Sequence, residues 1–187
     1  MLRTIRRLAQ SQAQLLVIDL QERLLPHIEA RERVVSQTVR MIRAARLLEL
    51  PICVTEQYPQ GLGPTTAAVL SAAEGCTALQ KLAFSVCGDE AALSRIRHAG
   101  RPLVLLAGIE THVCVLQTAL DLLAQGMTPF VLADAVGSRR AEDRAMALQR
   151  MREAGAVIST VESVIYEAMG CCGTELFRRM LPIVREP

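Results

Sequence analysis

Short apolar runs alternate along this chain with longer segments in which apolar residues recur at helical spacing. The short runs are almost continuously apolar, which is typical of strands covered on both faces. Six of them are expected to be β-strands: 14–20, 51–57, 77–81, 101–108, 128–134 and 156–163. Strands that alternate with helices favour a parallel sheet, because each helix returns the chain to the same end of the sheet.

The segments between these runs predict helices. After the first strand, Val35, Val39 and Ile42 form an apolar stripe at helical spacing. Thr111 is expected to cap the helix over 111–126 with its side chain. The other helices are expected at 32–50, 65–74, 89–99 and 138–155 and beyond residue 163, with a Gly- and Pro-rich loop at 58–65.

Together these elements predict an α/β protein, a three-layer α/β/α sandwich around a six-stranded parallel sheet. The 187 residues suit a single domain over residues 1–187. Apolar residues make up 51% of the chain and aromatic residues only 3%, so Leu, Val, Ala and Ile must build the core. This apolar surplus also favours a homo-oligomer with buried faces.

The charge balance argues against nucleic acid as a partner. The formal net charge is only +2, there is no Trp, and only two residues are Tyr, whereas nucleic-acid sites usually combine a basic face with stacking side chains. No stretch of about 18 apolar residues free of charge suggests a membrane span. We therefore expect a small-molecule substrate rather than a nucleic-acid or membrane partner.

The cysteines and histidines indicate a reducing compartment and no metal site. None of the six cysteines forms a C-x-x-C pair, so we expect mostly buried free thiols, with Cys171 and Cys172 in a packed turn. The first 20 residues lack the apolar region that secretion needs, which favours the cytoplasm. The three histidines are far apart in sequence, so we expect neither a metal nor another cofactor.

Three polar residues lie where the strands end. Asp19 ends the first strand, Lys81 ends the third, and Cys114 follows the fourth. Ligands of parallel α/β sheets bind beyond the carboxyl ends of the strands, so these side chains are candidates for a common site. Lys81 is the only lysine among 21 basic residues. This suggests a position that needs a compact charge or proton exchange, which a planar guanidinium does not provide, although chance retention is an alternative.

Cys114 is placed as a nucleophile. In the first turn of a helix, free backbone N–H groups and the helix dipole favour a thiolate, so its pKa is expected to fall. A small core residue on an apolar helix is the alternative interpretation. Asp19 is placed to accept the thiol proton and Lys81 to hold Asp19 charged, the arrangement of a nucleophile, a base and an orienting group. His112 is a poor partner for Cys114, because two helical steps turn side chains about 200° apart.

The motifs "LLVIDLQ", "TEQYPQGLGPT", "KLAFSV" and "LAGIETHVCVLQTALDL" resemble those of the isochorismatase-like cysteine hydrolases, in the same order over roughly 13–183. The resemblance implies that family's hydrolase fold, oligomers and a catalytic triad of Asp19, Lys81 and Cys114. It also implies a cis peptide bond between Ile109 and Glu110. The backbone N–H groups of Glu110 and Cys114 would then form the oxyanion hole.

The resemblance also narrows the chemistry. The family's nicotinamidases carry metal-binding histidines after the second strand, where this chain reads "TEQYPQGLGPT" and has none. Its isochorismate hydrolases lack the cysteine, which is present here as Cys114. We therefore expect a metal-independent hydrolase of a small amide or imide that works through an acyl-enzyme. The alternatives are a non-catalytic oligomeric scaffold and a vinyl-ether hydrolase driven by Asp19.

The expected substrate pocket is formed by residues next to these motifs. Its walls are predicted to include Gln21, Gln57, Tyr58, Phe84 and Glu110. Tyr58 and Phe84 are two of only five aromatic residues in the chain and are placed to clamp a flat amide, although they would equally serve to close the loop over the core.

Overall fold

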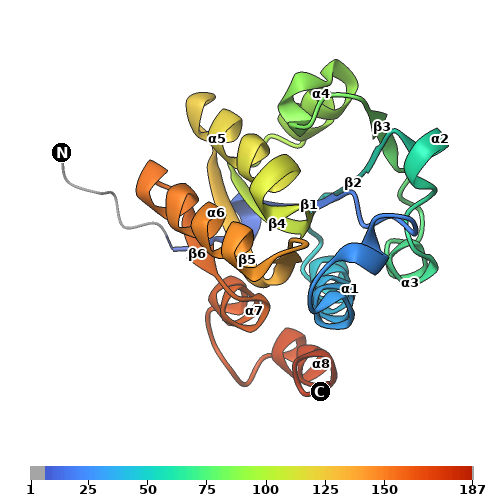
Figure 1. Ribbon diagram of the computed structural model, residues 1–187. Helices are drawn as coiled ribbons and strands as arrows, with labels where there is room; N and C mark the ends of the chain where they lie inside the picture. Colours follow the sequence, from blue (N-terminus) through green and yellow to red (C-terminus); the bar gives the residue numbers. More distant parts are fainter. Residues whose placement is uncertain (1–6, 187) are drawn as a thin grey trace.

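A computed structural model describes residues 7–186 of the chain; the beginning of the segment considered above for a targeting signal lies outside this range. Six strands form one parallel sheet: β1 (Ala13–Ile18), β2 (Ile52–Gln57), β3 (Leu79–Lys81), β4 (Leu103–Ile109), β5 (Thr128–Gly137) and β6 (Val157–Ser159). The strand order is β3-β2-β1-β4-β5-β6 (Figure 1). The predicted parallel α/β sheet is therefore confirmed.

Helices cover both faces of the sheet, as expected for a three-layer sandwich. They are α1 (Arg31–Leu47), α2 (Pro59–Leu62), α3 (Ala67–Ala72), α4 (Glu90–His98), α5 (Leu116–Ala124), α6 (Ala141–Ala154), α7 (Val161–Met169) and α8 (Glu175–Val184). One apolar core lies between the sheet and α1, α3, α7 and α8, and the other lies between the sheet and α4, α5 and α6 (Figure 1).

The two cores follow from the alternation of side chains along each strand. In β1, Leu15 and Val17 belong to the core beneath α1, whereas Leu16 and Ile18 belong to the core beneath α5. Because both faces are apolar, the strand reads as an unbroken hydrophobic run in the sequence.

Gly108 near the end of β4 is required by the close approach of β1. Its φ is +124°, and a Cβ placed there would lie 2.0 Å from the carbonyl oxygen of Ile18. Only glycine combines this backbone conformation with the absence of a side chain. The carboxyl ends of β1 and β4 are thereby held tightly together.

Several predicted boundaries are wrong in the second half of the chain. The strand predicted over 128–134 continues to 137, because β5 bulges outward: Leu106 pairs with Val131, but Gly108 pairs with Val136. The strand predicted over 156–163 ends at 159, because the Thr160 hydroxyl accepts a hydrogen bond from the Ser163 N–H and begins α7.

The helix predictions also need correction. The helix expected over 138–155 begins only at Ala141, and no side chain caps it. Thr111 does not cap the helix over 111–126: residues Thr111–Val115 form a π-helical turn, and the Thr111 hydroxyl is buried without a hydrogen-bond partner. The loop expected over 58–65 contains the short helix α2.

The cysteines are less buried than expected. All six are free, but only Cys53 and Cys114 are buried. Cys171 and Cys172 are exposed, so the packed turn predicted for them is wrong. Within residues 7–186, no helix is both long and apolar enough to cross a membrane.

Candidate active site

The candidate site lies where the order of the strands reverses, between β1 and β4. At such a point the connections on either side run in opposite directions and leave a crevice beyond the strand ends. Asp19 follows β1 directly and adopts a left-handed conformation with φ of 54°, which Asp tolerates better than most residues. Cys114 lies in the π-helical turn that follows β4.

Lys81 reaches Asp19 from β3, across the intervening strand β2. Its ammonium Nζ lies 2.6 Å from Asp19 Oδ2 and 2.6 Å from Gln57 Oε1. The carbonyl oxygens of Phe84 and Ala83 lie at 3.1 and 3.3 Å. The side chain is completely buried, so this compact charge is surrounded by acceptors on several sides. An ammonium suits such a cage, whereas the larger planar guanidinium of arginine does not.

The carboxylate of Asp19 is held through both of its oxygens. Oδ2 accepts from Lys81, and Oδ1 accepts from the Thr55 hydroxyl at 2.8 Å. Burial raises the pKa of Asp19 above its usual value of 3.8, while Lys81 opposes this shift and hydrogen bonds from Thr55 and the Cys114 thiol oppose it further. A carboxylate with a raised pKa is a better proton acceptor, as a general base requires.

The Cys114 thiol is coupled to Asp19 and Lys81, but it is not activated at rest. Burial, together with the charge of Asp19, raises its pKa to about 12 against the opposing effect of Lys81. The prediction that the pKa of Cys114 falls is therefore wrong. That prediction considered the helix start and left out the desolvation of a thiol that is only 5% exposed. The resting site contains a neutral thiol beside a carboxylate.

The turn that carries Cys114 is anchored on Glu110. The Glu110 carbonyl accepts hydrogen bonds from the N–H groups of Val113 at 3.1 Å and Val115 at 3.2 Å. The peptide bond between Ile109 and Glu110 is cis. His112 in the same turn bonds Ser138 through Nδ1 at 3.0 Å, so its ring is engaged away from Cys114.

The residues expected to line the pocket fall into two groups. Gln21 and Gln57 are buried. The Gln21 amide bonds the Gln57 backbone in both directions, and the Gln57 side chain bonds Lys81. These contacts give both residues a structural task in holding the site together. Tyr58 and Phe84 are 51% and 54% exposed beside Lys81, so they are available to a substrate.

Sequence reasoning missed two residues near this site. Thr55 holds Asp19, and a signal was present, since Thr55 lies near the carboxyl end of β2 next to Asp19. Arg139 donates from its N–H and its Nε to the Glu110 carboxylate, at 3.0 and 3.2 Å. No spacing in the sequence indicates this second contact.

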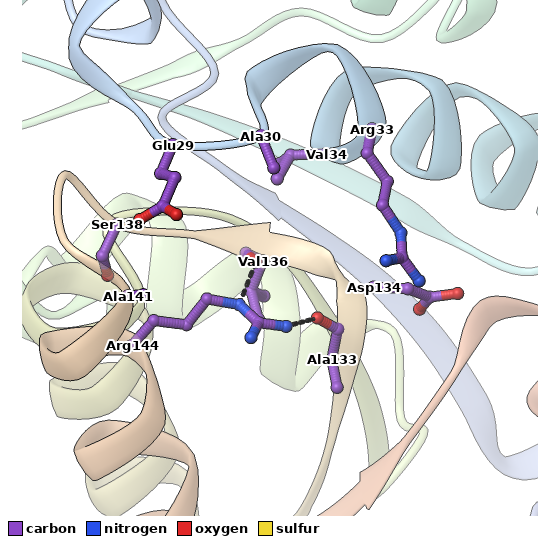
Figure 2. Close-up of a pocket in the computed structure, with 10 residues that line it drawn as sticks. All are labelled: Glu29, Ala30, Arg33, Val34, Ala133, Asp134, Val136, Ser138, Ala141 and Arg144. Carbon is purple, nitrogen blue, oxygen red and sulfur yellow. Dashed lines mark hydrogen bonds between the residues drawn. The ribbon is translucent and has the colours of Figure 1, made fainter.

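A separate pocket of about 140 Å³ lies beside the bulge of β5, between the beginnings of α1 and α6 (Figure 2). Arg144 crosses it and donates to the carbonyl oxygens of Val136 and Ala133, on the bulged part of β5 (Figure 2). Asp134 accepts from the Val161 N–H at 2.9 Å. The polar groups of this pocket are thus largely used to hold the bulge and α7, and the pocket is distinct from the Asp19 site.

Among residues 7–186, no group of three or more His, Cys, Asp or Glu side chains is arranged to hold a metal ion. Comparison with protein families matches residues 13–163 to the isochorismatase domain. The chain belongs to the isochorismatase family. The family assignment covers β1 to the beginning of α7 and thus includes Asp19, Lys81 and Cys114.

Relatives and solved structures agree with the isochorismatase fold. Isochorismatase domain-containing protein 2 from Pongo abelii is 42% identical over 176 residues, or 92% of this chain and 83% of the relative. MAR1 ribonuclease from Caenorhabditis elegans superposes with a TM-score of 0.91 at 36% identity, covering 97% of this chain and 93% of that chain. The three-layer fold and the hydrolase family are therefore both established.

A more distant structure shares the fold alone. The YcaC gene product of Escherichia coli, an octameric hydrolase of unknown specificity, has a TM-score of 0.89 at 23% identity. The similarity covers 98% of this chain and 95% of that chain. At this identity, the isochorismatase architecture is conserved over almost the full length, and nothing is implied about the reaction.

Proposed function

We propose that the protein is a metal-independent cysteine hydrolase that cleaves the C–N bond of a small amide or imide through an acyl-enzyme on Cys114. The observation that carries the proposal is the buried Asp19 carboxylate, which is bonded to Lys81 at 2.6 Å and is coupled electrostatically to the buried Cys114 thiol. A neutral thiol next to a poised base loses its proton only as it attacks, which limits side reactions of a free thiolate.

In the proposed first half-reaction, Cys114 Sγ attacks the substrate carbonyl carbon while Asp19 takes the thiol proton. The oxygen becomes an oxyanion, which the backbone N–H groups of Glu110 and Cys114 stabilise. Asp19 then gives the proton to the leaving nitrogen, and the C–N bond breaks. Lys81 keeps Asp19 oriented and stabilises its charged form throughout.

In the second half-reaction, Asp19 takes a proton from water, and the resulting hydroxide attacks the thioester carbon. The bond to sulfur breaks, a carboxylic acid leaves, and the proton returns to Cys114. The scheme uses no metal, in agreement with the absence of histidine from 51–65, where metal-binding relatives are expected to carry it.

The proposal is tested with Cys114→Ala in a screen of small amides and imides, with mass spectrometry of the intact protein to detect the acyl adduct. Cys87→Ala is the matched control, because Cys87 is also a partly desolvated thiol but lies outside the site. We expect Cys114→Ala to abolish turnover and adduct formation. Turnover that survives in Cys114→Ala would instead support vinyl-ether hydrolysis driven by Asp19, and no reactive thiol or turnover at all would support a scaffold.

RNA hydrolysis is the second candidate, because the C. elegans protein that is 36% identical over 97% of this chain is a ribonuclease. Scarce aromatic residues and a net charge of +2 count against it. Incubation with end-labelled single-stranded RNA decides between them. Cleavage that is lost in Asp19→Asn would favour the ribonuclease over the amide hydrolase.

We also propose that the protein is a homo-oligomer, as the E. coli fold relative is an octamer. Leu82 is 75% exposed and Phe84 54% exposed, on the same loop after β3. Large exposed apolar side chains that cluster favour a protein interface. Light scattering on the wild type and on Leu82→Asp tests this, with a single monomeric mass for both as the contradicting result.

A further inference from the structure

The carboxylate of Glu110 is an unexplained buried charge at the edge of the proposed site. Its side chain is 9% exposed, and it is the residue whose backbone begins the turn with Cys114. A buried carboxylate is costly unless hydrogen bonds and an opposite charge compensate it. Left uncompensated, this buried charge would disturb the turn whose backbone N–H groups are proposed to hold the oxyanion.

Arg139 provides this compensation. Its backbone N–H donates to Glu110 Oε2 at 3.0 Å, and its Nε donates to the same oxygen at 3.2 Å. The imidazole of His112 is also nearby: its Nδ1 is 4.0 Å from the same oxygen but is already bonded to the Ser138 hydroxyl. The guanidinium is thus the permanent cation that faces Glu110.

Arg139 is itself held in place by the segment that connects β5 to α6. The Ser138 hydroxyl is 3.0 Å from His112 Nδ1, and the Ser138 carbonyl accepts from the Glu29 N–H at 3.0 Å. The turn after β4 and the segment after β5 are therefore tied together by Glu110–Arg139 on one side and His112–Ser138 on the other. This double tie restricts movement of the turn that carries the nucleophile.

We infer that Arg139 is a positioning residue for the oxyanion hole: it fixes Glu110, whose backbone begins the turn with Cys114, and neutralises its carboxylate. This role rests on the proposed function and adds to it a residue from β5–α6 that neither the triad nor the family motifs include. Arg139 touches no reacting atom, since its contacts are with the Glu110 side chain.

The test measures acylation of Cys114 by p-nitrophenyl acetate, in which sulfur attacks the ester carbon and p-nitrophenolate leaves. The burst of p-nitrophenolate gives the maximal acylation rate and the half-saturating concentration separately. Arg139→Ala is compared with Arg140→Ala, an adjacent exposed arginine, with Glu110→Gln, and with the double variant Arg139→Ala/Glu110→Gln. Thermal unfolding of each variant checks that it is folded.

We expect Arg139→Ala to lower the maximal rate about tenfold with little change in half-saturation, less than the roughly 100- to 1,000-fold cost of deleting an oxyanion-hole donor. Arg140→Ala should match the wild type. Glu110→Gln removes the charge that Arg139 compensates, so the double variant should recover part of the rate, while the positioning contact of Arg139 Nε stays lost. For a contact that is merely structural, the acylation rate would change only in step with the thermal stability of each variant.

Two results overturn the inference in different ways. The first case requires that the wild type shows Cys114-dependent acylation. If Arg139→Ala then behaves like Arg140→Ala, or if the double variant is no faster than Arg139→Ala, the role of Arg139 is wrong while the proposed hydrolase stands. If the wild type shows no acylation that Cys114→Ala abolishes, the proposed function fails and the role of Arg139 fails with it.

Discussion

Two basic side chains, Lys81 of β3 and Arg144 of α6, both bond backbone carbonyl groups but are used in different ways. Lys81 is fully buried and contacts a carboxylate, an amide and two carbonyl oxygens with a single nitrogen. Arg144 is half-buried and uses two nitrogens of its fork to bond two carbonyl oxygens in the bulge of β5. The lysine faces an acid that can exchange a proton, and the arginine faces only backbone.

The difference explains why a chain that otherwise uses arginine has one lysine. A planar fork with divergent donors suits two carbonyl groups at neighbouring positions of a bulged strand. A compact ammonium suits a closed cage in which one atom must serve acceptors on several sides and stabilise a buried charge. The Arg144 site needs only donors in the right geometry, whereas the Lys81 site needs a positive charge beside the Asp19 carboxylate.

Removing the cation from the lysine site should have the largest effect. In Lys81→Met, Asp19 is left buried without its counter-ion, so the free energy of unfolding should fall by about 3–5 kcal/mol at pH 8. Burial raises the pKa of Asp19 in the folded state, so its ionisation opposes folding, and the loss should be smaller at pH 5 than at pH 8 because a lower pH favours the protonated carboxyl. Urea unfolding at both pH values measures this.

The double variant Asp19→Asn/Lys81→Met is the control for that measurement. It removes the buried charge altogether, so its stability should depend less on pH than that of Lys81→Met. Equal losses of stability at pH 5 and pH 8 in Lys81→Met would contradict the assignment of the loss to an unpaired Asp19.

Replacing Lys81 by arginine tests whether the site needs an ammonium group or only a positive charge. Lys81→Arg keeps the charge but places a larger planar group in a cage whose contacts are as short as 2.6 Å. We expect Cys114-dependent turnover to fall at least about 100-fold, or roughly 2.7 kcal/mol. Steady-state kinetics on the amide found in the screen measures it, and a Lys81→Arg enzyme of near wild-type activity would refute our account of the lone lysine.

The reciprocal exchange should affect stability and leave the chemistry intact. Arg144→Lys can retain one of the two carbonyl contacts in the bulge, so unfolding should become easier by about 1–2 kcal/mol. The acylation rate of Cys114 should stay within about twofold of the wild type. Urea unfolding measures the expected loss of stability, and the p-nitrophenyl acetate burst measures the acylation rate. A large loss of acylation would show that the bulge of β5 and the Asp19 site are coupled.

The smallest expected effect concerns the reactivity of the Cys114 thiol, on which Asp19 and Lys81 act in opposite directions. Asp19 raises the pKa of Cys114 and Lys81 lowers it, so Asp19→Asn should speed alkylation of Cys114 by iodoacetamide at pH 8, about three- to tenfold. Lys81→Met should slow it, while both variants lose turnover. Site-resolved mass spectrometry follows the reaction, and slower alkylation in Asp19→Asn would reverse our assignment of the two charges.

The position of Asp19 and Lys81 was predictable because it depends on strand ends. A parallel sheet brings the carboxyl ends of its strands to one edge, so Asp19 and Lys81 were expected to meet there although 62 positions separate them. The cage around Lys81 was not predictable in the same way. It depends on carbonyl groups of Ala83 and Phe84, whose direction is set by the loop and not by residue type.

The remaining differences have physical causes that a sequence does not display. The pKa of Cys114 depends on its burial, which only packing determines. The bulge of β5 depends on how far two strands can stay in register, and Arg144 stabilises it from another element. The Glu110–Arg139 contact joins residues 29 positions apart through a backbone and a side-chain donor, a combination that leaves no motif.

Gly108 sets a limit on how this protein can be re-engineered. Even a methyl group at Gly108 would collide with the Ile18 carbonyl. The short distance between β1, which precedes Asp19, and β4, which precedes Cys114, therefore depends on the absence of a Cβ atom at this position. A library intended to change specificity should therefore leave this position untouched and vary the exposed side chains at Tyr58 and Phe84. The side chains near Lys81 can be redesigned, but the separation of β1 and β4 cannot.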